Sequence, residues 1–148
     1  MKMHPPLAQI IDRGNDPTGF GHFGAKRGFY KNGKRRYHKG YDIVSKIGED
    51  VVSMIDGVVT KIGYAYAKAL QFRYVEVTND TFRVRLMYIE HDYVKVGQKV
   101  CSGDRVGYCL GIANYHNRNK KKGQLLMINH LHIQIWKNGK LIDPKQYL

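Results

Sequence analysis

The sequence has no long apolar run and no low-complexity tract. A membrane-spanning helix needs roughly 18 or more consecutive apolar residues, so we expect no transmembrane segment. The first residues, "MKMHPPLAQIIDRGNDP", lack the apolar centre of a secretory signal, and we expect no signal peptide in this chain. A helical period of 3.6 residues is also missing from every longer segment, which excludes a mainly helical fold.

Acidic residues and cysteines are scarce. The 12 Asp and Glu stand against 25 Lys and Arg, and the formal charge of +13 favours a polyanionic partner such as nucleic acid, anionic lipid or an anionic polymer of bacterial envelopes. No helix-turn-helix, RNP or zinc-finger pattern accompanies this charge, so we expect no nucleic-acid partner. Cys101 and Cys109 lack the spacing of a zinc site, and we interpret them as packing residues, with a disulfide as the less favoured alternative.

What is present indicates a single all-β domain. The 148 residues suffice for one hydrophobic core, and 16 glycines and 11 tyrosines accompany many Val and Ile residues. Asp56-Gly57 between "DVVSMI" and "VVTKIGYAY" predicts one hairpin, and Asn79-Asp80 between "FRYVEVT" and "FRVRLMYIE" predicts a second. A last strand over 128–136 reaches the turn Asn138-Gly139. We therefore predict an antiparallel β-sheet or sandwich.

Two segments have the composition of loops. The region before Tyr37 is rich in glycine and basic residues, and we expect it to be ordered by its aromatic residues, Phe20, Phe23, Phe29 and Tyr30. The segment 114–124, "NYHNRNKKKGQ", reads as a polar basic loop. We expect loops 14–37 and 114–124 to form the walls of a groove. The predicted domain spans 1–148, with 1–19 as an extension and 20–148 as the core.

The last strand carries two histidines on one face. In an extended strand, alternate residues point the same way, so His130 and His132 share a face. The opposite face is apolar and belongs to the core, with Leu131, Ile133 and Ile135. The histidine face therefore looks onto the groove.

A second pair, His38 and Asp42, lies in "RRYHKGYDIVS". Gly40 and the β-branched residues after Asp42 favour a loop that enters a strand. Imidazole and carboxylate are both zinc ligands, and three protein ligands with one open position are typical of catalytic zinc. His38, Asp42 and one of the two C-terminal histidines would supply that set.

These segments resemble a known family. "HKGYDI", "VVSMIDGVVTKIGYAY", "VKVGQKVCSGDRVG" and "HLHIQIWKNGKLIDPKQYL" occur in the order seen in lysostaphin-type (LytM-like) zinc metallopeptidases. The resemblance covers about residues 20 to 148. It implies one zinc per chain bound by His38, Asp42 and His132, with His130 as a catalytic residue beside it. The implied function is hydrolysis of peptide bonds in bacterial peptidoglycan, in a stem peptide or cross-bridge, through a zinc-activated water.

One position departs from the family pattern. The family has a further catalytic histidine in a "Y-x-H" strand, and counting back from Gly97 places Tyr88 there. His91 lies three residues further and should face away, as a surface residue. Tyrosine also occurs at this position in phage-type relatives and in the vertebrate leukocyte chemotaxin. The resemblance thus implies a phage-type peptidase with Tyr88 in the site, or alternatively an inactive zinc-binding module of this fold that binds cell wall or a protein.

The remaining expectations concern other histidines and the setting. His22 could shield the metal but is read as a surface loop residue, and His4 and His116 need no role. We expect a monomer whose partners are peptidoglycan and anionic wall polymers. Its expected place of action is the cell wall or periplasm, on a virion or after release by a phage holin.

Overall fold

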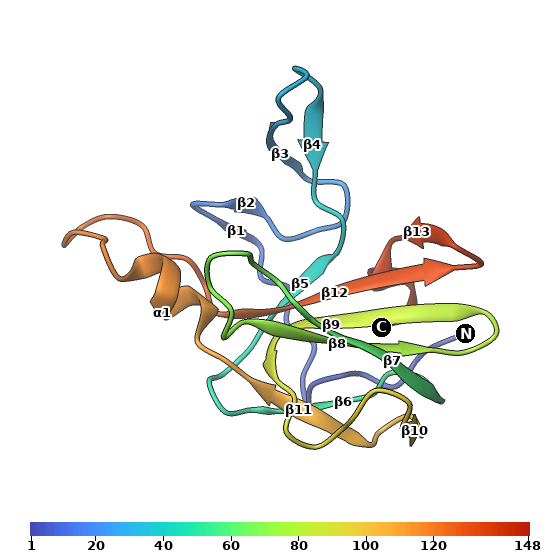
Figure 1. The fold of residues 1–148 in the computed structure, drawn as a ribbon. Coiled ribbons are helices and arrows are strands. Elements are labelled where there is room, and N and C mark those ends of the chain that lie inside the picture. The colour runs from blue at the N-terminus through green and yellow to red at the C-terminus, as the bar shows by residue number, and fades with distance from the viewer.

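The computed structural model describes residues 1–148 and is built around an antiparallel sheet of nine strands (Figure 1). The strands of this sheet are β5 (Tyr41–Val44), β6 (Asp50–Val52), β7 (Gly57–Tyr64), β8 (Arg73–Thr78), β9 (Phe82–Glu90), β10 (Lys99–Val100), β11 (Arg105–Cys109), β12 (His130–Lys137) and β13 (Lys140–Ile142). The smaller elements are the strands β1 (Asn15–Asp16), β2 (Gly19–Phe20), β3 (Lys26–Phe29) and β4 (Arg35–Tyr37), the helix α1 (Ile112–Asn117) and a 3-10 turn (Pro144–Tyr147). The predicted all-β antiparallel fold is confirmed.

Strand β12 lies at the centre of this arrangement. The continuous strand order is β10-β7-β8-β9-β11-β6, and β12 pairs with β9 along one edge and with β5 and β13 along the other. All of these pairings are antiparallel, so the register of each strand fixes which side chains share a face. Segments far apart in the sequence meet here, because β12 pairs with β5.

Of the two hairpins predicted from turn residues, one is confirmed and one is wrong. Strands β8 and β9 pair across the Asn79-Asp80 turn, as predicted, and β12 and β13 form a further hairpin. The hairpin predicted at Asp56-Gly57 is wrong, because β6 pairs with β11 whereas β7 pairs with β8 and β10. At this point the chain passes through the core, where Met54 is buried, instead of folding back on itself.

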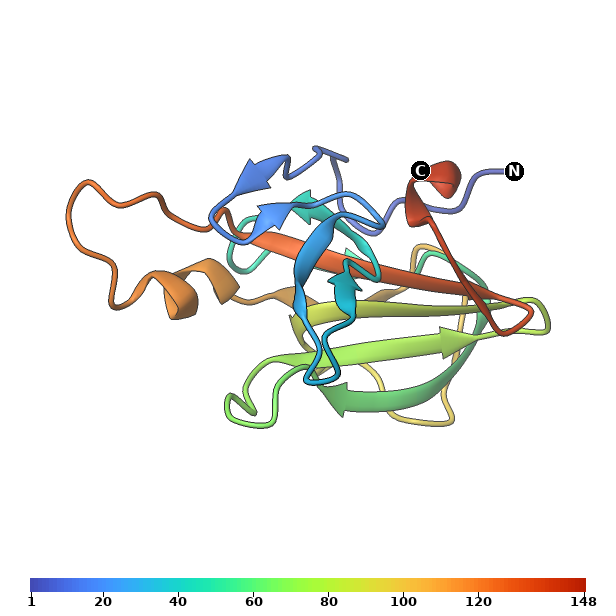
Figure 2. The ribbon, with the colours of Figure 1, turned by 90° about the horizontal axis from the view of Figure 1, so that it is seen from above.

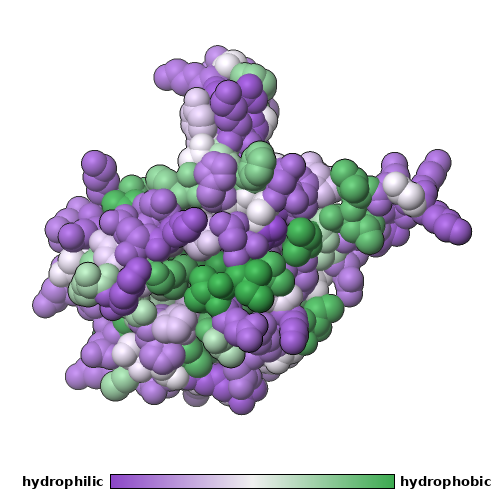
Figure 3. All heavy atoms as spheres, turned by 180° about the vertical axis from the view of Figure 1, so that it is seen from behind, coloured by the Kyte–Doolittle hydropathy of each residue, from purple (hydrophilic) through white to green (hydrophobic).

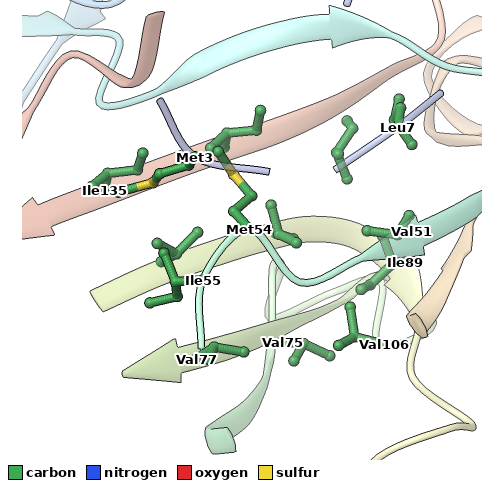
Figure 4. Packing of buried hydrophobic residues seen from close by; sticks show 14 of the residues in the cluster. Met3, Leu7, Val51, Met54, Ile55, Val75, Val77, Ile89, Val106 and Ile135 are labelled. Carbon is green, nitrogen blue, oxygen red and sulfur yellow. The ribbon is translucent and has the colours of Figure 1, made fainter. Parts of the chain in front are cut away.

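The core contains both ends of the chain. Met3 lies beside Met54 and Ile135 in the main apolar cluster, and Leu7 belongs to the same cluster (Figure 4). The Met3 amide also donates to the carbonyl oxygen of Tyr147 at 2.9 Å. Met3 and Leu7, in the segment 1–19 predicted as an extension, thus pack into the core of the domain.

The β3–β4 hairpin stands away from the sheet. Figure 1 shows it rising from the body, and the view from above shows it overlying the middle of the sheet (Figure 2). Its surface is mostly hydrophilic (Figure 3). The prediction that Phe20, Phe29 and Tyr30 anchor this region is wrong, since each is exposed. Arg35 instead covers the Phe29 ring, with its guanidinium carbon 4.2 Å from the ring centroid.

The segment predicted as a basic loop begins with a helix. Helix α1 extends to Asn117, and the chain after it projects from one end of the sheet (Figure 1). At six residues, α1 is too short to show a helical period in the sequence. No helix in the structure has the length and apolar character to cross a membrane. Cys101 and Cys109 are free thiols, and only Cys109 is buried, so the packing role predicted for Cys101 is wrong.

Candidate metal centre and catalytic groove

The register of β5 and β12 brings two of the candidate ligands together. Asp42 is the direct cross-strand partner of His132, and opposite residues in an antiparallel pair project from the same face. The His132 Nδ1 atom lies 2.7 Å from Asp42 Oδ1, and both residues are buried. Leu131 and Ile133, on the other face of β12, are fully buried in the core and hold the strand in place.

His38 reaches the same point from the loop between β4 and β5. Its Nε2 atom is 3.1 Å from His132 Nδ1 and 3.3 Å from Asp42 Oδ1. Its other ring nitrogen, Nδ1, is 3.0 Å from the carbonyl oxygen of His22 and donates to it. Because that bond places the ring proton on Nδ1, the Nε2 lone pair faces Asp42 and His132, as a metal ligand requires.

His38 Nε2, Asp42 Oδ1 and His132 Nδ1 are close enough together to bind one zinc ion. Zinc bonds to nitrogen and oxygen are about 2.0–2.1 Å long, and in a tetrahedral site the ligand atoms lie roughly 3.3 Å apart. The separations of 3.1 and 3.3 Å from His38 are close to that value, and the 2.7 Å between His132 and Asp42 is shorter, as in a hydrogen bond. His38, Asp42 and His132 form the one group in the chain whose ligand atoms gather in this way, all within 4.8 Å of one another.

Arg13 lies directly behind this group and was not anticipated from the sequence. Its side chain is fully buried, its Nε atom is 3.2 Å from Asp42 Oδ2, and its guanidinium also pairs with Asp16. Burial alone would raise the pKa of Asp42, but the adjacent His132 and His38 side chains hold that pKa far below its usual range. Asp42 is therefore ionised and is held between histidines in front and a guanidinium behind.

His130 faces the same site from β12. Its Nδ1 atom donates to the carbonyl oxygen of Ile128 at 2.8 Å, which leaves the Nε2 lone pair on the side of Asp42, 3.7 Å from Oδ2. Burial lowers the pKa of His130. A neutral imidazole in this orientation can accept a proton.

Tyr88 enters the site through a break in strand β9. The β8–β9 register shifts beside it, and its φ of 74° lies in the left-handed region that non-glycine residues seldom adopt. The burial of alternate residues along β9 is interrupted at the same point. The Tyr88 ring stands edge-on to His130, with the centroids 5.4 Å apart. Such backbone strain is typical of functional sites.

These side chains surround a cavity of about 390 Å³. Its lining includes all five candidate site residues, together with Arg27, Tyr30, Arg36 and Tyr37 from the β3–β4 region and Tyr66, His116 and Met127 from the other side. Both segments expected to wall the groove thus contribute to it. His91 does not line it, and His22 supplies only its backbone carbonyl to His38.

The family is decided by the sequence match. Residues 36–144, well over half of the chain, match peptidase family M23. The chain belongs to peptidase family M23. The lysostaphin-type resemblance is thereby confirmed, and the M23 family is zinc-dependent, in agreement with the nitrogen and oxygen ligand set of His38, Asp42 and His132.

The chain is also similar to individual proteins. The chain is 26% identical, over 113 residues, to an uncharacterized metalloprotease of Buchnera aphidicola subsp. Baizongia pistaciae (strain Bp), covering 76% of this chain and 26% of that protein. It is similar to Helicobacter pylori Csd3, with 22% identity and a TM-score of 0.66 over 100% of this chain and 35% of that one. The chain therefore spans about a quarter to a third of these relatives.

The catalytic domain of the antimicrobial peptidase lysostaphin from Staphylococcus simulans has nearly the size of this chain. It is 21% identical with a TM-score of 0.60, and the match covers 90% of this chain and 92% of that domain. At these identities the solved structures establish the fold. The M23 chain has the β-sheet architecture of lysostaphin.

Proposed function

We propose that the chain is a zinc-dependent endopeptidase that hydrolyses peptide bonds in bacterial peptidoglycan, within a stem peptide or a cross-bridge. The observation that carries this proposal is the convergence of His38, Asp42 and His132 at a cavity that His130 and Tyr88 also face. Membership of family M23 supports the peptidase reaction and the use of zinc.

The chain's own residues would divide the chemistry among them. Zinc held by His38, Asp42 and His132 would supply Lewis-acid activation of the scissile carbonyl and of the attacking water. His130, neutral and with Nε2 turned inward, would accept the proton of that water and pass it to the leaving amine. Tyr88 would donate a hydrogen bond to the developing oxyanion, because burial raises its pKa well above 10 and keeps it protonated.

The basic residues that line the groove suggest how an anionic cell-wall polymer would be attracted. Arg27, Arg36 and Lys39 line the cavity, and Lys34 and Arg35 lie on the same hairpin, in a chain with a formal charge of +13. Such a surface raises the local concentration of an anionic polymer, and the effect weakens as salt screens the charges. We therefore include anionic wall polymers among its partners and the cell wall as its place of action.

Tyr88 also favours a second candidate, a zinc-binding module of this fold that binds the wall without cutting it. A phenol is a poor proton acceptor near neutral pH, so the site would be inactive if the reaction needed a second basic group at this position. The inward Nε2 of His130 supplies one acceptor, which favours the enzyme over the binding module.

Digestion of purified peptidoglycan tests the proposal. Sacculi of several wall chemotypes are incubated with the zinc-loaded protein, and the soluble products are identified by mass spectrometry. We expect new amino and carboxyl termini at one type of peptide bond, absent after chelation and absent with His130→Ala. Wall binding without any new terminus, in every chemotype, would contradict the enzyme and support the binding module. Repeating the digestion at rising salt tests the role of the basic surface.

A further inference from the structure

A row of polar contacts leads from the rim of the groove to Tyr88. The Tyr66 hydroxyl donates to the Tyr88 hydroxyl oxygen across 3.3 Å, and the Tyr66 oxygen is 3.2 Å from Nε2 of His116. The Tyr66 and Tyr88 rings are stacked, with centroids 5.8 Å apart and an interplanar angle of 15°. Hydrogen bonds of catalytic groups are often this long before a substrate binds.

The direction of the contact between Tyr66 and His116 follows from the number of hydrogens available. A tyrosine hydroxyl has one hydrogen and two lone pairs. Since Tyr66 uses its hydrogen on Tyr88, the contact with His116 requires that His116 Nε2 carry a proton and donate it to Tyr66. The hydroxyl hydrogen of Tyr88 is then not used by Tyr66 and is available to the groove.

Packing and hydrogen bonds hold His116, Tyr66 and Tyr88 in these positions. Phe72, which is buried, meets the rings of Tyr66 and Tyr88 edge-on, at centroid distances of 6.1 and 6.4 Å. Helix α1, which carries His116, is fixed by hydrogen bonds at both ends. The Ala113 amide donates to Asn129 Oδ1, and the Asn117 side chain makes two hydrogen bonds to the backbone of Met127.

We propose that His116 and Tyr66 are positioning residues that direct the hydroxyl hydrogen of Tyr88 into the groove, toward the oxyanion of the scissile amide. This role rests on the proposed peptidase function. Without the two residues, the Tyr88 hydroxyl would be free to rotate, and its hydrogen could turn away from the substrate. The exposed His116 is thereby connected to the reacting atoms through two phenols, although it does not touch them.

The first test does not depend on turnover. In the zinc-loaded protein, nitrogen-15 NMR of the imidazole rings reports which nitrogen of His116 carries the proton. We expect the proton on Nε2, and we expect Tyr66→Phe to shift the Nε2 resonance because it removes the acceptor. Tyr115→Phe, a matched loss of a hydroxyl on the same helix, should leave that resonance in place. An unprotonated Nε2 in the wild-type protein would overturn the proposed direction of the bonds.

The second test separates positioning from binding. With a peptidoglycan-derived peptide as substrate, Tyr66→Phe and His116→Ala should each lower kcat about tenfold, a fraction of the loss expected when an oxyanion donor is removed entirely. KM and zinc content should stay at wild-type values. His116→Gln, whose amide can donate in place of Nε2, should recover most of the rate, and Tyr115→Phe should match the wild type.

The outcomes distinguish this inference from the proposed function. Unchanged kcat in Tyr66→Phe and His116→Ala, with an active wild type, would contradict the positioning role and leave the peptidase intact. A wild type without turnover on any wall substrate would contradict the peptidase, and with it the catalytic purpose of the positioning. The NMR result would then still decide the hydrogen-bond direction.

Discussion

Asp42 and His132 are direct cross-strand partners in the β5–β12 ladder, and Asp42 Oδ1 lies 2.7 Å from His132 Nδ1. The geometry of the candidate metal centre is therefore a property of the sheet as much as of the side chains. A change that shifts the register or the spacing of these strands should affect metal binding even if it leaves every ligand in place.

Gly40→Ala tests this dependence. A Cβ atom at Gly40 would overlap the carbonyl oxygen of Ile133 and would lie 2.7 Å from the His132 ring, so β5 or the ring must move. We expect zinc affinity to fall roughly 10- to 100-fold, the range seen when the supports of metal ligands are altered. A competition titration with a zinc chelator measures this.

Gly28→Ala is the matched control, because no atom lies within 4 Å of its added Cβ. Its zinc affinity should equal that of the wild type. Equal affinity in Gly40→Ala would show that the close approach of Gly40 to His132 has no part in shaping the centre.

Arg13→Met tests the buried cation behind Asp42. Removing one partner of a buried ion pair leaves an uncompensated charge, and we expect the free energy of unfolding of the metal-free protein to fall by about 3–5 kcal/mol. Urea denaturation followed by circular dichroism measures the change. Arg105→Ala breaks an exposed ion pair with Asp50 and should lower stability by less than about 1 kcal/mol. Equal losses in the two variants would argue against a special role for Arg13.

Tyr88→Phe and His91→Ala test the assignment of the altered family position. Tyr88 faces His130 across the groove, whereas His91 lies outside the cavity with its Nε2 3.7 Å from Glu90 Oε1. Loss of an oxyanion donor lowers kcat about 10²- to 10³-fold, and we expect this of Tyr88→Phe in steady-state kinetics. His91→Ala should retain full kcat. The opposite pattern would mean that His91, and not Tyr88, takes part in the reaction.

Thiol reactivity tests the placement of the two cysteines. Burial raises the pKa of Cys109 to about 12, so its thiol is both inaccessible and protonated at neutral pH. Cys101 is exposed. Iodoacetamide should add one label to the native wild-type protein and none to the native Cys101→Ser variant, as counted by intact mass. Two labels on the native wild type would place Cys109 at the surface.

Much of the site could be predicted from the sequence because it depends on simple periodicity. The alternation in β12 separates His130 and His132 from Leu131 and Ile133, and the buried core on one side confirms it. The meeting of these histidines with Asp42 depends on a long-range strand pairing, which periodicity does not reveal. It is suggested by the metal-binding chemistry of the side chains and by the family resemblance.

Other features of the site and the fold could not be predicted from the sequence. Nothing in the sequence around Arg13 predicts that it is buried. Its burial depends on the loop after it, where Thr18 and Gly19 accept hydrogen bonds from its guanidinium. No glycine or asparagine marks the positive φ of Tyr88, so a prediction of regular alternation continues through a residue that interrupts it. The Asp56-Gly57 pair satisfied the local preference for a hairpin, but β6 and β7 found other partners in the sheet.

We expect one zinc, held by His38, Asp42 and His132, to be required for peptidoglycan hydrolysis. The most direct measurement is a zinc titration of the chelator-stripped protein, with bound metal and newly released peptide termini determined in the same samples. We expect hydrolysis to rise in proportion to bound zinc and to level off at one zinc per chain, and Asp42→Ala to acquire neither. Hydrolysis by the stripped protein, or full zinc binding by Asp42→Ala, would contradict the account.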